Sequence, residues 1–381
     1  MSDWKEYKLG EVCSFVKDKI SIRDVGAKVY ISTENMLPDK GGITQSSSIP
    51  SEGMVTRYYP ETILISNIRP YFKKIWLAKT DGGCSNDVLC FKGNDGLVNS
   101  NFLYYLLSQD TFFEYVMLGS KGCKMPRGDK DHIMKWNVLL PPIDEQKRIA
   151  GVLSSLDDKI DLLNRENATL EALAETLFRH YFIEKPDPTW KEGNIADVVD
   201  FNPARKLGKG EKAPYVEMAN IGTNGYAPSS WRIRSFVSGT KFINGDTLMA
   251  RISPCLENGK AAFVDFLEKE QVGWGSTEFI VMRSKLGIHP FFAYVLSRYD
   301  DFRDHAVSSL VGSSGRQRVD LDNLIKYPFI IPGKQAIELF NHELNTIFPK
   351  MQNNQKQILT LTAQRDTLLS RLMNGEVNVV E

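Results

Sequence analysis

The chain has 381 residues, which is enough for two ordinary domains with sizeable hydrophobic cores. Its 42% hydrophobic and 25% charged content is typical of a soluble globular protein, and no apolar run approaches the roughly eighteen residues that a membrane span requires. The 47 basic residues are balanced by 47 acidic residues, which argues against a positively coated protein that binds nucleic acid indiscriminately. Because the N-terminal residues are polar, we also expect a cytoplasmic protein without a signal peptide.

The cysteines and histidines are not spaced like metal ligands. The sequence contains no Cys-x-x-Cys pair, no His-x-x-x-His and no His-Glu-x-x-His. We therefore expect free thiols, the more apolar ones in cores, and no metal ion bound by this chain. The five cysteines are Cys13, Cys84, Cys90, Cys123 and Cys255.

The sequence contains an internal repeat. Trp4-Lys5-Glu6 recurs as Trp190-Lys191-Glu192, and Lys135 and Lys326 begin a stretch in which the two copies keep a constant offset of 191 positions. A single match of this kind can arise by chance. Many matches in the same order, separated only by small insertions, indicate a repeat. The chain is therefore interpreted as a tandem duplication. Further matched residues are Tyr30 and Tyr215, Asn35 and Asn220, Thr62 and Thr247, Pro141 and Pro332, and Leu177 and Leu368.

Each copy is predicted to begin with an α/β segment. Strands are expected at Thr62–Ile65, Val88–Phe91 and Val138–Leu140, and at Thr247–Ile252, Phe279–Met282 and Phe329–Ile331. One aromatic-rich helix is expected in each copy, at Phe102–Met117 and at Phe291–Val307. Proline then ends the last strand and a long helix follows, for which Asp144 is the predicted N-cap in the first copy.

The two long helices carry an apolar stripe that steps by four, three, four and three residues. A 3.5-residue period over about four heptads is typical of a coiled-coil seam, and each helix needs a partner to cover it, so we expect the two to pair with each other. Asn167 and Asn354 interrupt the stripe. Either they fix the register of the pair or they lie at a wet stretch of seam, and the sequence leaves both possibilities open. The stripe residues are Ile149, Leu153, Leu156, Ile160, Leu163, Leu170, Ala174 and Leu177, and Phe340, Leu344, Ile347, Met351, Ile358, Leu361, Leu368 and Leu372.

The predicted fold is α+β, with two similar α/β recognition domains separated by two long helices. The helices could pair in either direction; we expect an antiparallel coiled coil, which relates the copies by a pseudo-two-fold axis and suits the two-fold symmetry of duplex DNA. The recognition domains are expected at residues 1–141 and 184–332, and the helical regions at 142–183 and 333–381. About 40 residues at 1.5 Å each give a rod of about 60 Å. Because the seam is almost complete at Phe178, we expect an insertion there to be tolerated.

No catalytic centre is predicted. Asn202-Pro203-Ala204-Arg205 lacks the second proline and the aromatic residue of an amino-methyltransferase motif, so a turn after a strand is the better interpretation. Gly312–Gly315 has the composition of a flexible loop and not of a nucleophile elbow. The sequence contains no nucleotide-binding Gly-x-x-x-x-Gly-Lys-Ser/Thr loop, and we see no acidic cluster that would hold a nuclease magnesium ion.

Basic segments at equivalent places in the two copies are the candidate DNA-binding sites. One runs from Asn67 to Lys79 without an acidic residue, and the other is a glycine-flanked loop before the last strand of each domain. Lys and Arg neutralise phosphates, whereas Arg, Gln and Asn can also bind base edges with two hydrogen bonds. The candidate residues are Asn35, Arg69, Lys73, Lys74, Lys121, Lys124 and Arg127 in copy one, and Asn220, Arg251, Arg316, Gln317 and Arg318 in copy two.

The chain resembles the specificity subunits of type I restriction–modification systems over essentially its whole length. The segments that carry the resemblance are Pro141–Gln146, Leu153–Ile160, Thr169–Phe178, Gly315–Val319 and Arg365–Glu376. Copy one departs from the pattern in the loop, where Cys123–Arg127 replaces the Gly-Arg-Gln-Arg form. Copy two departs at the start of the long helix, where Gly333-Lys334-Gln335 replaces Ile143–Gln146.

The resemblance implies that each recognition domain reads one half of a bipartite DNA target. It also implies two adenine-N6 methyltransferase subunits that use S-adenosylmethionine, and restriction and translocase subunits that use ATP and magnesium. These cofactors belong to the partners, and none is expected in this chain. Two alternatives remain open: a coiled-coil scaffold whose α/β domains bind protein, and an enzyme with an unrecognised site.

Overall fold

The computed structural model describes residues 3–184, 186–313, 315–377 and 379. The chain forms two compact units, unit 1 of Met1–Lys159 with Leu361–Glu381 and unit 2 of Ile160–Thr360. The long helices α5 (Ile143–Phe178) and α10 (Lys334–Met373) each contribute one part to each unit. The boundary between the two compact units therefore lies within the long helices. The domain boundaries predicted at residues 141, 183 and 332 lie instead near the ends of these helices.

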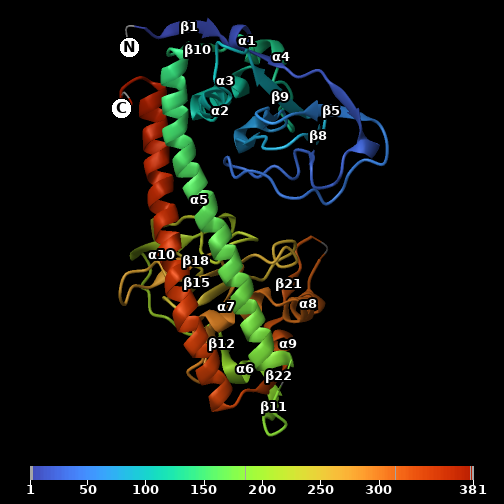
Figure 1. Cartoon of the computed structure of the whole chain (residues 1–381). Helices are drawn as coiled ribbons and strands as arrows, with labels where there is room; N and C mark the ends of the chain where they lie inside the picture. Colours follow the sequence, from blue (N-terminus) through green and yellow to red (C-terminus); the bar gives the residue numbers. More distant parts are fainter. Residues whose placement is uncertain (1–2, 185, 314, 378, 380–381) are drawn as a thin grey trace. The chain divides into compact units, whose positions relative to one another are not determined.

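Unit 1 contains two four-stranded sheets and one two-stranded sheet, with short helices beside them (Figure 1). The sheets have the orders β2-β9-β6-β7, β3-β5-β8-β4 and β1-β10. Their strands are β1 (Lys5–Lys8), β2 (Cys13–Phe15), β3 (Lys19–Ser21), β4 (Tyr30–Ile31), β5 (Met54–Tyr58), β6 (Ile63–Ser66), β7 (Ile75–Leu77), β8 (Gly82–Cys84), β9 (Val88–Gly93) and β10 (Asn137–Leu140). The helices are α1 (Leu9–Val12), η1 (Ile22–Asp24), η2 (Pro70–Phe72), α2 (Ser100–Leu107), α3 (Asp110–Leu118) and α4 (Lys130–Ile133).

Unit 2 repeats this plan with the orders β12-β19-β16-β17, β14-β13-β18-β15 and β11-β22, and adds the pair β20-β21. Its strands are β11 (Lys191–Asn194), β12 (Val199–Phe201), β13 (Lys212–Val216), β14 (Arg232–Ser235), β15 (Thr240–Phe242), β16 (Thr247–Ala250), β17 (Ala261–Phe263), β18 (Gly273–Gly275), β19 (Phe279–Ser284), β20 (Leu310–Val311), β21 (Arg318–Val319) and β22 (Pro328–Ile331). The helices are η3 (Arg179–Glu184), α6 (Ile195–Val198), η4 (Met218–Asn220), α7 (Phe291–Arg298), α8 (Asp300–Ser308) and α9 (Leu321–Leu324).

The strand pairings confirm the predicted repeat. β4 runs parallel to β8 with Tyr30 opposite Gly83, and β13 runs parallel to β18 with Tyr215 opposite Trp274. The fourth strand of this sheet differs between the copies, because β3 pairs with β5 in unit 1 whereas β14 pairs with β13 in unit 2. The six strands expected from the sequence are present, each with ends shifted by one or two residues.

The single aromatic-rich helix predicted in each copy is wrong, because each is two helices. Gln109, before α3, and Tyr299, before α8, have extended backbone angles, with ψ of 146° and 127°. The apolar period continues across both breaks, so periodicity alone does not reveal them. The predicted N-cap Asp144 is also wrong: α5 begins at Ile143, and the backbone N–H of Gln146 already donates to the carbonyl of Pro142.

The helices α5 and α10 pack against each other in each unit, and the described contacts run antiparallel. In unit 1, Ile149 and Leu153 share a core cluster with Leu369 and Leu372. In unit 2, the chain advances from Asn167 to Phe182 while the contacts on α10 move back from Asn354 to Phe340. The apolar stripe predicted from the sequence is thus the seam of an antiparallel pair, as expected.

Asn167 and Asn354 bind each other in the buried seam of unit 2. The amide nitrogen of Asn354 donates to the amide oxygen of Asn167 at 3.0 Å and to Glu166 at 2.8 Å. Asn167 in turn donates to the backbone carbonyl of Met351 at 3.4 Å. Both side chains are at most 5% exposed, so the contacts favour the register interpretation over a wet stretch of seam.

The five cysteines are free thiols, as predicted, and Cys13, Cys84 and Cys90 are buried. Cys84 and Cys90 lie with their sulfur atoms 3.1 Å apart in a core cluster that also contains Tyr58 and Leu64. Burial raises the pKa of the Cys13 thiol to about 12, so it stays protonated at neutral pH. These buried cysteines therefore act as small core residues.

Candidate nucleic-acid interface

A short hairpin carries the glycine-flanked basic loop in each unit. In unit 1, Lys121 and Arg127 exchange two backbone hydrogen bonds of 2.9 Å. In unit 2, Val311 pairs with Arg318 between β20 and β21. Each loop turns at a glycine with positive φ, 97° at Gly122 and 117° at Gly312. A residue with a Cβ would adopt this backbone conformation only under strain. We call residues 121–127 and 311–318 the basic hairpins; Ser314 lies outside the described residues.

Equivalent backbone hydrogen bonds attach each basic hairpin to the segment that follows β6 or β16. In unit 1, Arg69 N–H donates to the carbonyl of Pro126 at 2.8 Å. In unit 2, Ser253 N–H donates to Gln317 at 3.0 Å and Val319 N–H donates to Arg251 at 2.8 Å. The structure thereby brings together the two basic segments that the sequence predicted separately.

An acidic residue holds one arginine of each basic hairpin. Arg127 Nη2 lies 3.2 Å from Asp87, and Arg318 Nη2 lies 2.6 Å from Glu278 with Arg318 Nε at 2.9 Å from the same carboxylate. Hydrogen bonding from Arg318 lowers the pKa of Glu278 and keeps the carboxylate charged at neutral pH. Asp87 and Glu278 are 191 positions apart, the offset of the repeat, but sequence reasoning missed them because attention went to basic residues.

The remaining predicted hairpin residues differ in how freely they can reach a ligand. Arg316 and Lys124 are exposed, and no partner of either side chain is found among the described residues. Gln317 is half-buried. Lys121 is 81% exposed but forms an ion pair of 2.5 Å with Asp129, and this contact, with the backbone N–H of His132, lowers the pKa of Asp129 to about 2.

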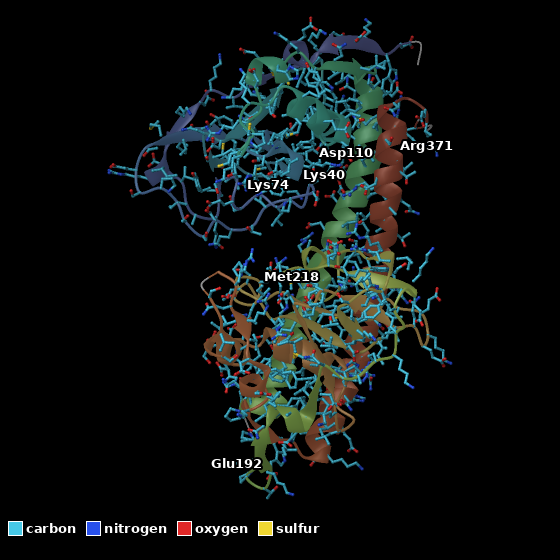
Figure 2. All side chains as sticks on the ribbon, turned by 180° about the vertical axis from the view of Figure 1, so that it is seen from behind. Lys40, Lys74, Asp110, Glu192, Met218 and Arg371 are labelled. Atoms are coloured by element: carbon cyan, nitrogen blue, oxygen red, sulfur yellow. The ribbon has the colours of Figure 1, made fainter. Side chains whose placement is uncertain are left out.

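Two lysines of the basic segment Asn67–Lys79 are bound by other residues of unit 1. Lys73 and Lys40 lie 3.0 and 3.1 Å from the carboxylate of Asp110. Partial burial opposes ionisation of Asp110, but the two lysines hold its pKa below the ordinary value. Lys74 donates to the backbone carbonyl of Thr33 at 2.6 Å, and burial lowers its pKa. Figure 2 shows Lys40, Lys74 and Asp110 on the same side of unit 1.

Arg69 and Arg251, at the hairpin attachment points, are half-buried, and Nε of each is buried without a partner among the described residues. Arg251 Nη2 donates to the backbone carbonyl of Val319 at 3.2 Å. Arg69 has a left-handed backbone conformation with φ of 51°. Both arginines therefore lie beside the basic hairpins, with hydrogen-bonding capacity still unused.

Asn35 and Asn220 shape loops. In each, the side-chain oxygen accepts from the backbone N–H three residues earlier, Ser32 at 2.6 Å and Glu217 at 3.0 Å. The backbone carbonyl of each accepts from the N–H nine residues later, Thr44 and Ser229. Asn35 is only 5% exposed, so little of its side chain is accessible to a ligand.

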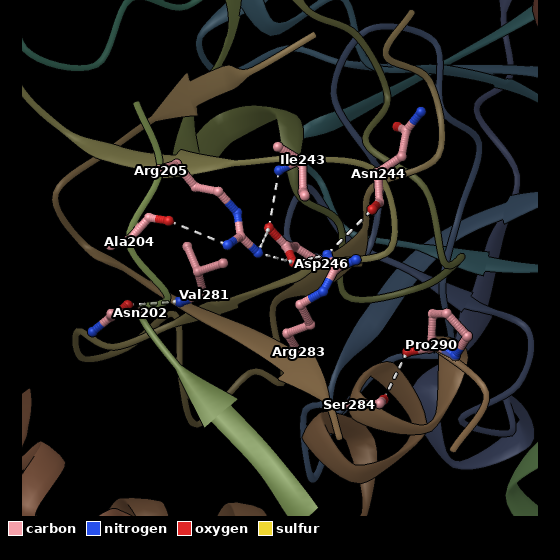
Figure 3. A network of polar contacts seen from close by, with 10 residues as sticks. All are labelled: Asn202, Ala204, Arg205, Ile243, Asn244, Asp246, Val281, Arg283, Ser284 and Pro290. Carbon is pink, nitrogen blue, oxygen red and sulfur yellow. Dashed lines mark hydrogen bonds and ion pairs between the residues drawn. The ribbon is translucent and has the colours of Figure 1, made fainter. Parts of the chain in front are cut away.

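Asn202–Arg205 forms the turn after a strand, as predicted. Asn202 follows β12, and its side-chain oxygen accepts from the backbone N–H of Val281 at 2.9 Å. Arg205 and Arg283 bind the fully buried carboxylate of Asp246 at 3.1 and 2.6 Å (Figure 3). The buried carboxylate is thus compensated by two guanidinium groups, and the contact is structural.

Each basic hairpin with its attached segment offers exposed cations, an ordered arginine and hydrogen-bond donors. Cations of this kind bind phosphates, and an ordered arginine can bind the edge of a guanine. Among the described residues, no group of three His, Cys, Asp or Glu side chains is placed to hold a metal ion. In the same residues, no helix combines the length and apolar character that a membrane crossing requires.

The chain is similar to specificity subunits of type I restriction enzymes. Residues 1–172 match the family model described as type I restriction modification DNA specificity domain. The chain is 27% identical over 368 residues to the type I restriction enzyme MjaIX specificity subunit of Methanocaldococcus jannaschii, covering 85% of this chain and 80% of the relative. It is 22% identical over 462 residues to the HindI specificity subunit of Haemophilus influenzae, covering 99% of this chain and 100% of the relative.

A solved structure shares the fold. The crystal structure of the type I restriction–modification system S subunit from M. genitalium superposes with a TM-score of 0.56 at 17% identity. The match covers 97% of this chain and 96% of that chain. At this identity the likeness concerns the fold alone, and it extends over nearly the whole chain.

Proposed function

We propose that the chain belongs to the specificity-subunit family of type I restriction–modification systems, whose members are non-catalytic components of the complex, because residues 1–172 match the family model and two specificity subunits align with most of the chain. From this premise we propose that each unit reads one half of a bipartite DNA target through its basic hairpin. We also propose that α5 and α10 set the spacer between the half-sites and dock two methyltransferase subunits. The chain would act in the cytoplasm, where its DNA is.

One observation supports the proposal above the others: the same basic hairpin occurs twice. In both copies the hairpin is attached to the segment that follows β6 or β16, and it carries an exposed cation with no partner among the described residues. Each copy also has an arginine held by an acidic residue at the repeat offset. A protein-binding scaffold has no need for two cationic loops in equivalent positions. Two similar readers on one chain suit a target made of two separated parts.

The catalytic cofactors are proposed to belong to the partner subunits. Methylation of adenine would use S-adenosylmethionine on the methyltransferase subunits, and translocation and cleavage would use ATP and magnesium on the restriction subunits. This chain would supply sequence recognition only. Purified free of partners, it is expected neither to methylate nor to cut DNA, and robust turnover by such a preparation would contradict the proposal.

The decisive experiment maps methylated adenines in DNA that has been exposed to the chain together with its methyltransferase partner. Replacing Arg316, Gln317 and Arg318 with alanine should relax one half-site, while the other half-site and the spacer stay unchanged. The matched variant, Lys121, Lys124 and Arg127 to alanine, should relax the opposite half-site. Each lost bidentate base contact is expected to cost about 1–3 kcal/mol of discrimination. If both triple variants methylate the wild-type pattern, the basic hairpins are not the readers.

A further inference from the structure

Arg318 is held by Glu278 in one orientation in unit 2. Arg318 Nε lies 2.9 Å and 3.1 Å from the two carboxylate oxygens, and Nη2 lies 2.6 Å from one of them. A guanidinium has five N–H groups in a rigid plane. The contact with Glu278 uses its side edge, Nε with one N–H of Nη2. Three N–H groups remain, and two of them lie on the end edge formed by Nη1 and Nη2, where they can bind a ligand.

Both members of this pair are fixed by the backbone around them. Ser253 N–H donates to the carbonyl before Arg318, and Val319 N–H, directly after it, donates to Arg251. The carbonyl of Glu278 accepts from Arg251 N–H at 3.0 Å. The carboxylate is the more buried partner, with 22% of its side chain exposed against 46% for Arg318. The arginine therefore extends outward from a carboxylate that belongs to the fold.

We propose that Glu278 is a positioning residue that presents the end edge of Arg318 to a guanine in the half-site read by unit 2. Guanine offers two acceptors, O6 and N7, in the major groove, and an arginine end edge binds them with two parallel hydrogen bonds. An arginine without such a carboxylate would have to be ordered on binding, at a cost in side-chain entropy. The inference rests on the proposed function, because it assumes that the basic hairpin faces DNA.

Unit 1 carries a looser version of the same pair. Arg127 contacts Asp87 through a single separation of 3.2 Å, and both side chains are more exposed, 58% and 39%. Aspartate is also one methylene shorter than glutamate. The Arg127 guanidinium is thus less restricted in orientation, so loss of Asp87 is expected to change base preference less than loss of Glu278.

The test uses the chain assembled with its methyltransferase partner and a library of duplexes randomised across both half-sites. Arg318→Ala and Arg318→Lys should each remove a guanine preference at one position, by about tenfold or more. Glu278→Gln should weaken the preference at that same position and nowhere else. In an Arg318→Ala background, Glu278→Gln should have no further effect, which shows that it acts through the arginine.

Two controls separate the inference from simpler explanations. Asp200→Asn removes one negative charge from the ion pair between the exposed Asp200 of β12 and Lys285 in the same unit, and it should leave every preference unchanged. Thermal unfolding should show that Glu278→Gln remains folded, because Arg318 is exposed enough to be hydrated. Asp87→Asn should alter one position of the other half-site by a smaller factor.

The possible failures are distinct. If Glu278→Gln raises affinity for all duplexes alike, the carboxylate only repels phosphates and the positioning role is overturned. If Arg318→Ala leaves each preference intact while the wild type reads two half-sites, the inference fails and the proposed function stands. If the wild-type complex methylates without any bipartite preference, the proposed function itself fails.

Discussion

Arg316 lies two positions from Arg318 but has no partner among the described residues. Its side chain is exposed in the basic hairpin of unit 2, whereas Arg318 is bound by Glu278. An exposed cation that no carboxylate orients suits a phosphate, whose charge can be met from many directions. The two arginines should therefore separate into an affinity residue and a specificity residue.

Arg316→Ala is accordingly expected to weaken binding to all duplexes uniformly without changing the half-site. Because one phosphate contact is lost, the slope of log affinity against log salt should become shallower by about 0.9. Titrations of labelled duplex at several salt concentrations would measure this. Lys124→Ala, in the equivalent loop of unit 1, is the matched variant. A change in base preference with an unchanged slope would reverse the assignment.

His289 is a half-buried imidazole two residues before α7. Its Nδ1 accepts a hydrogen bond of 3.2 Å from the backbone N–H of Phe291, and burial lowers its pKa from 6.5 to about 4. The folded pKa lies below the unfolded value, so the unfolded chain binds more protons between these limits. The stabilisation from neutral His289 is therefore complete above about pH 6.5 and is lost as the pH falls towards 4.

His289→Asn should reduce this pH dependence, because asparagine offers an acceptor oxygen near the position of Nδ1 but does not take up a proton. Denaturant unfolding at pH 7 and pH 4.5 would compare the two proteins. The difference in unfolding free energy between these pH values should be smaller in the variant. The exposed His342 provides the control substitution, His342→Asn, which should behave like the wild type.

At the scale of the elements, the paired long helices contain a polar layer formed by Asn167 and Asn354. Because the amide nitrogen of Asn354 donates to the buried amide oxygen of Asn167, removing one partner strands a buried polar group and should cost about 1–3 kcal/mol of unfolding free energy. Replacing both by leucine removes the unsatisfied group as well. The double variant is therefore expected to be at least as stable as Asn354→Leu, the single variant that we expect to be the less stable.

Thermal or denaturant unfolding of Asn167→Leu, Asn354→Leu and the double variant would complete a double-mutant cycle. A strong positive coupling between the two sites supports the polar layer as a matched pair. Additive losses would show instead that each asparagine acts through its other contact, Met351 or Glu166.

The elements that could be predicted from the sequence are those with a strong local signal. The seam of α5 and α10 was predictable because an apolar stripe with a 3.5-residue period has one structural meaning. The breaks before Asp110 and Asp300 were not, because an apolar period continues through them. The different edge strands β3 and β14 were also beyond prediction, since a strand pattern does not identify its neighbour.

The same limit applies to the candidate site. Basic, glycine-flanked loops are visible in the sequence, and the repeat shows that they are equivalent. Whether a lysine is available is not visible: Lys73 and Lys121 are engaged by Asp110 and Asp129, which lie 37 and 8 positions away. Glu278 precedes a strand far from Arg318 in the chain, so the pair exists only after folding.

At the scale of the whole molecule, both long helices pass from one compact unit into the other. The packing around Phe178 argues against the expectation that an insertion after this residue would be tolerated. Phe178 is fully buried, and its ring lies 5.3 Å from that of Phe292 and 5.9 Å from that of Phe182. An insertion there would pull Phe182 out of the core of unit 2.

A spacer test needs matched insertions at the boundary between the units instead. Seven residues inserted after Lys159 in α5 and seven after Thr360 in α10 keep the heptad seam in phase. Each insertion adds about 10 Å of helix, which equals about three base pairs of duplex. If the helices set the spacer, methylated-adenine mapping should find the same half-sites with a spacer longer by about three base pairs.

The insertion into α5 alone is the control, since it lengthens one helix against an unchanged partner and should lower stability. A folded and active double insertion that keeps the original spacer would show that another part of the complex fixes the distance.

Unit 1 is assembled from both extremes of the described chain, with Leu372 and Met373 packed in the same core as Leu9 and Val138. Unit 2 is contiguous. Domains usually fold in the order in which the ribosome produces them. Here we expect the reverse order, because the later unit can close while the earlier one still lacks the helical turns at residues 361–373. A nascent chain would then expose an unfinished apolar surface until those residues are made, and a product truncated before them would present that surface to chaperones and proteases.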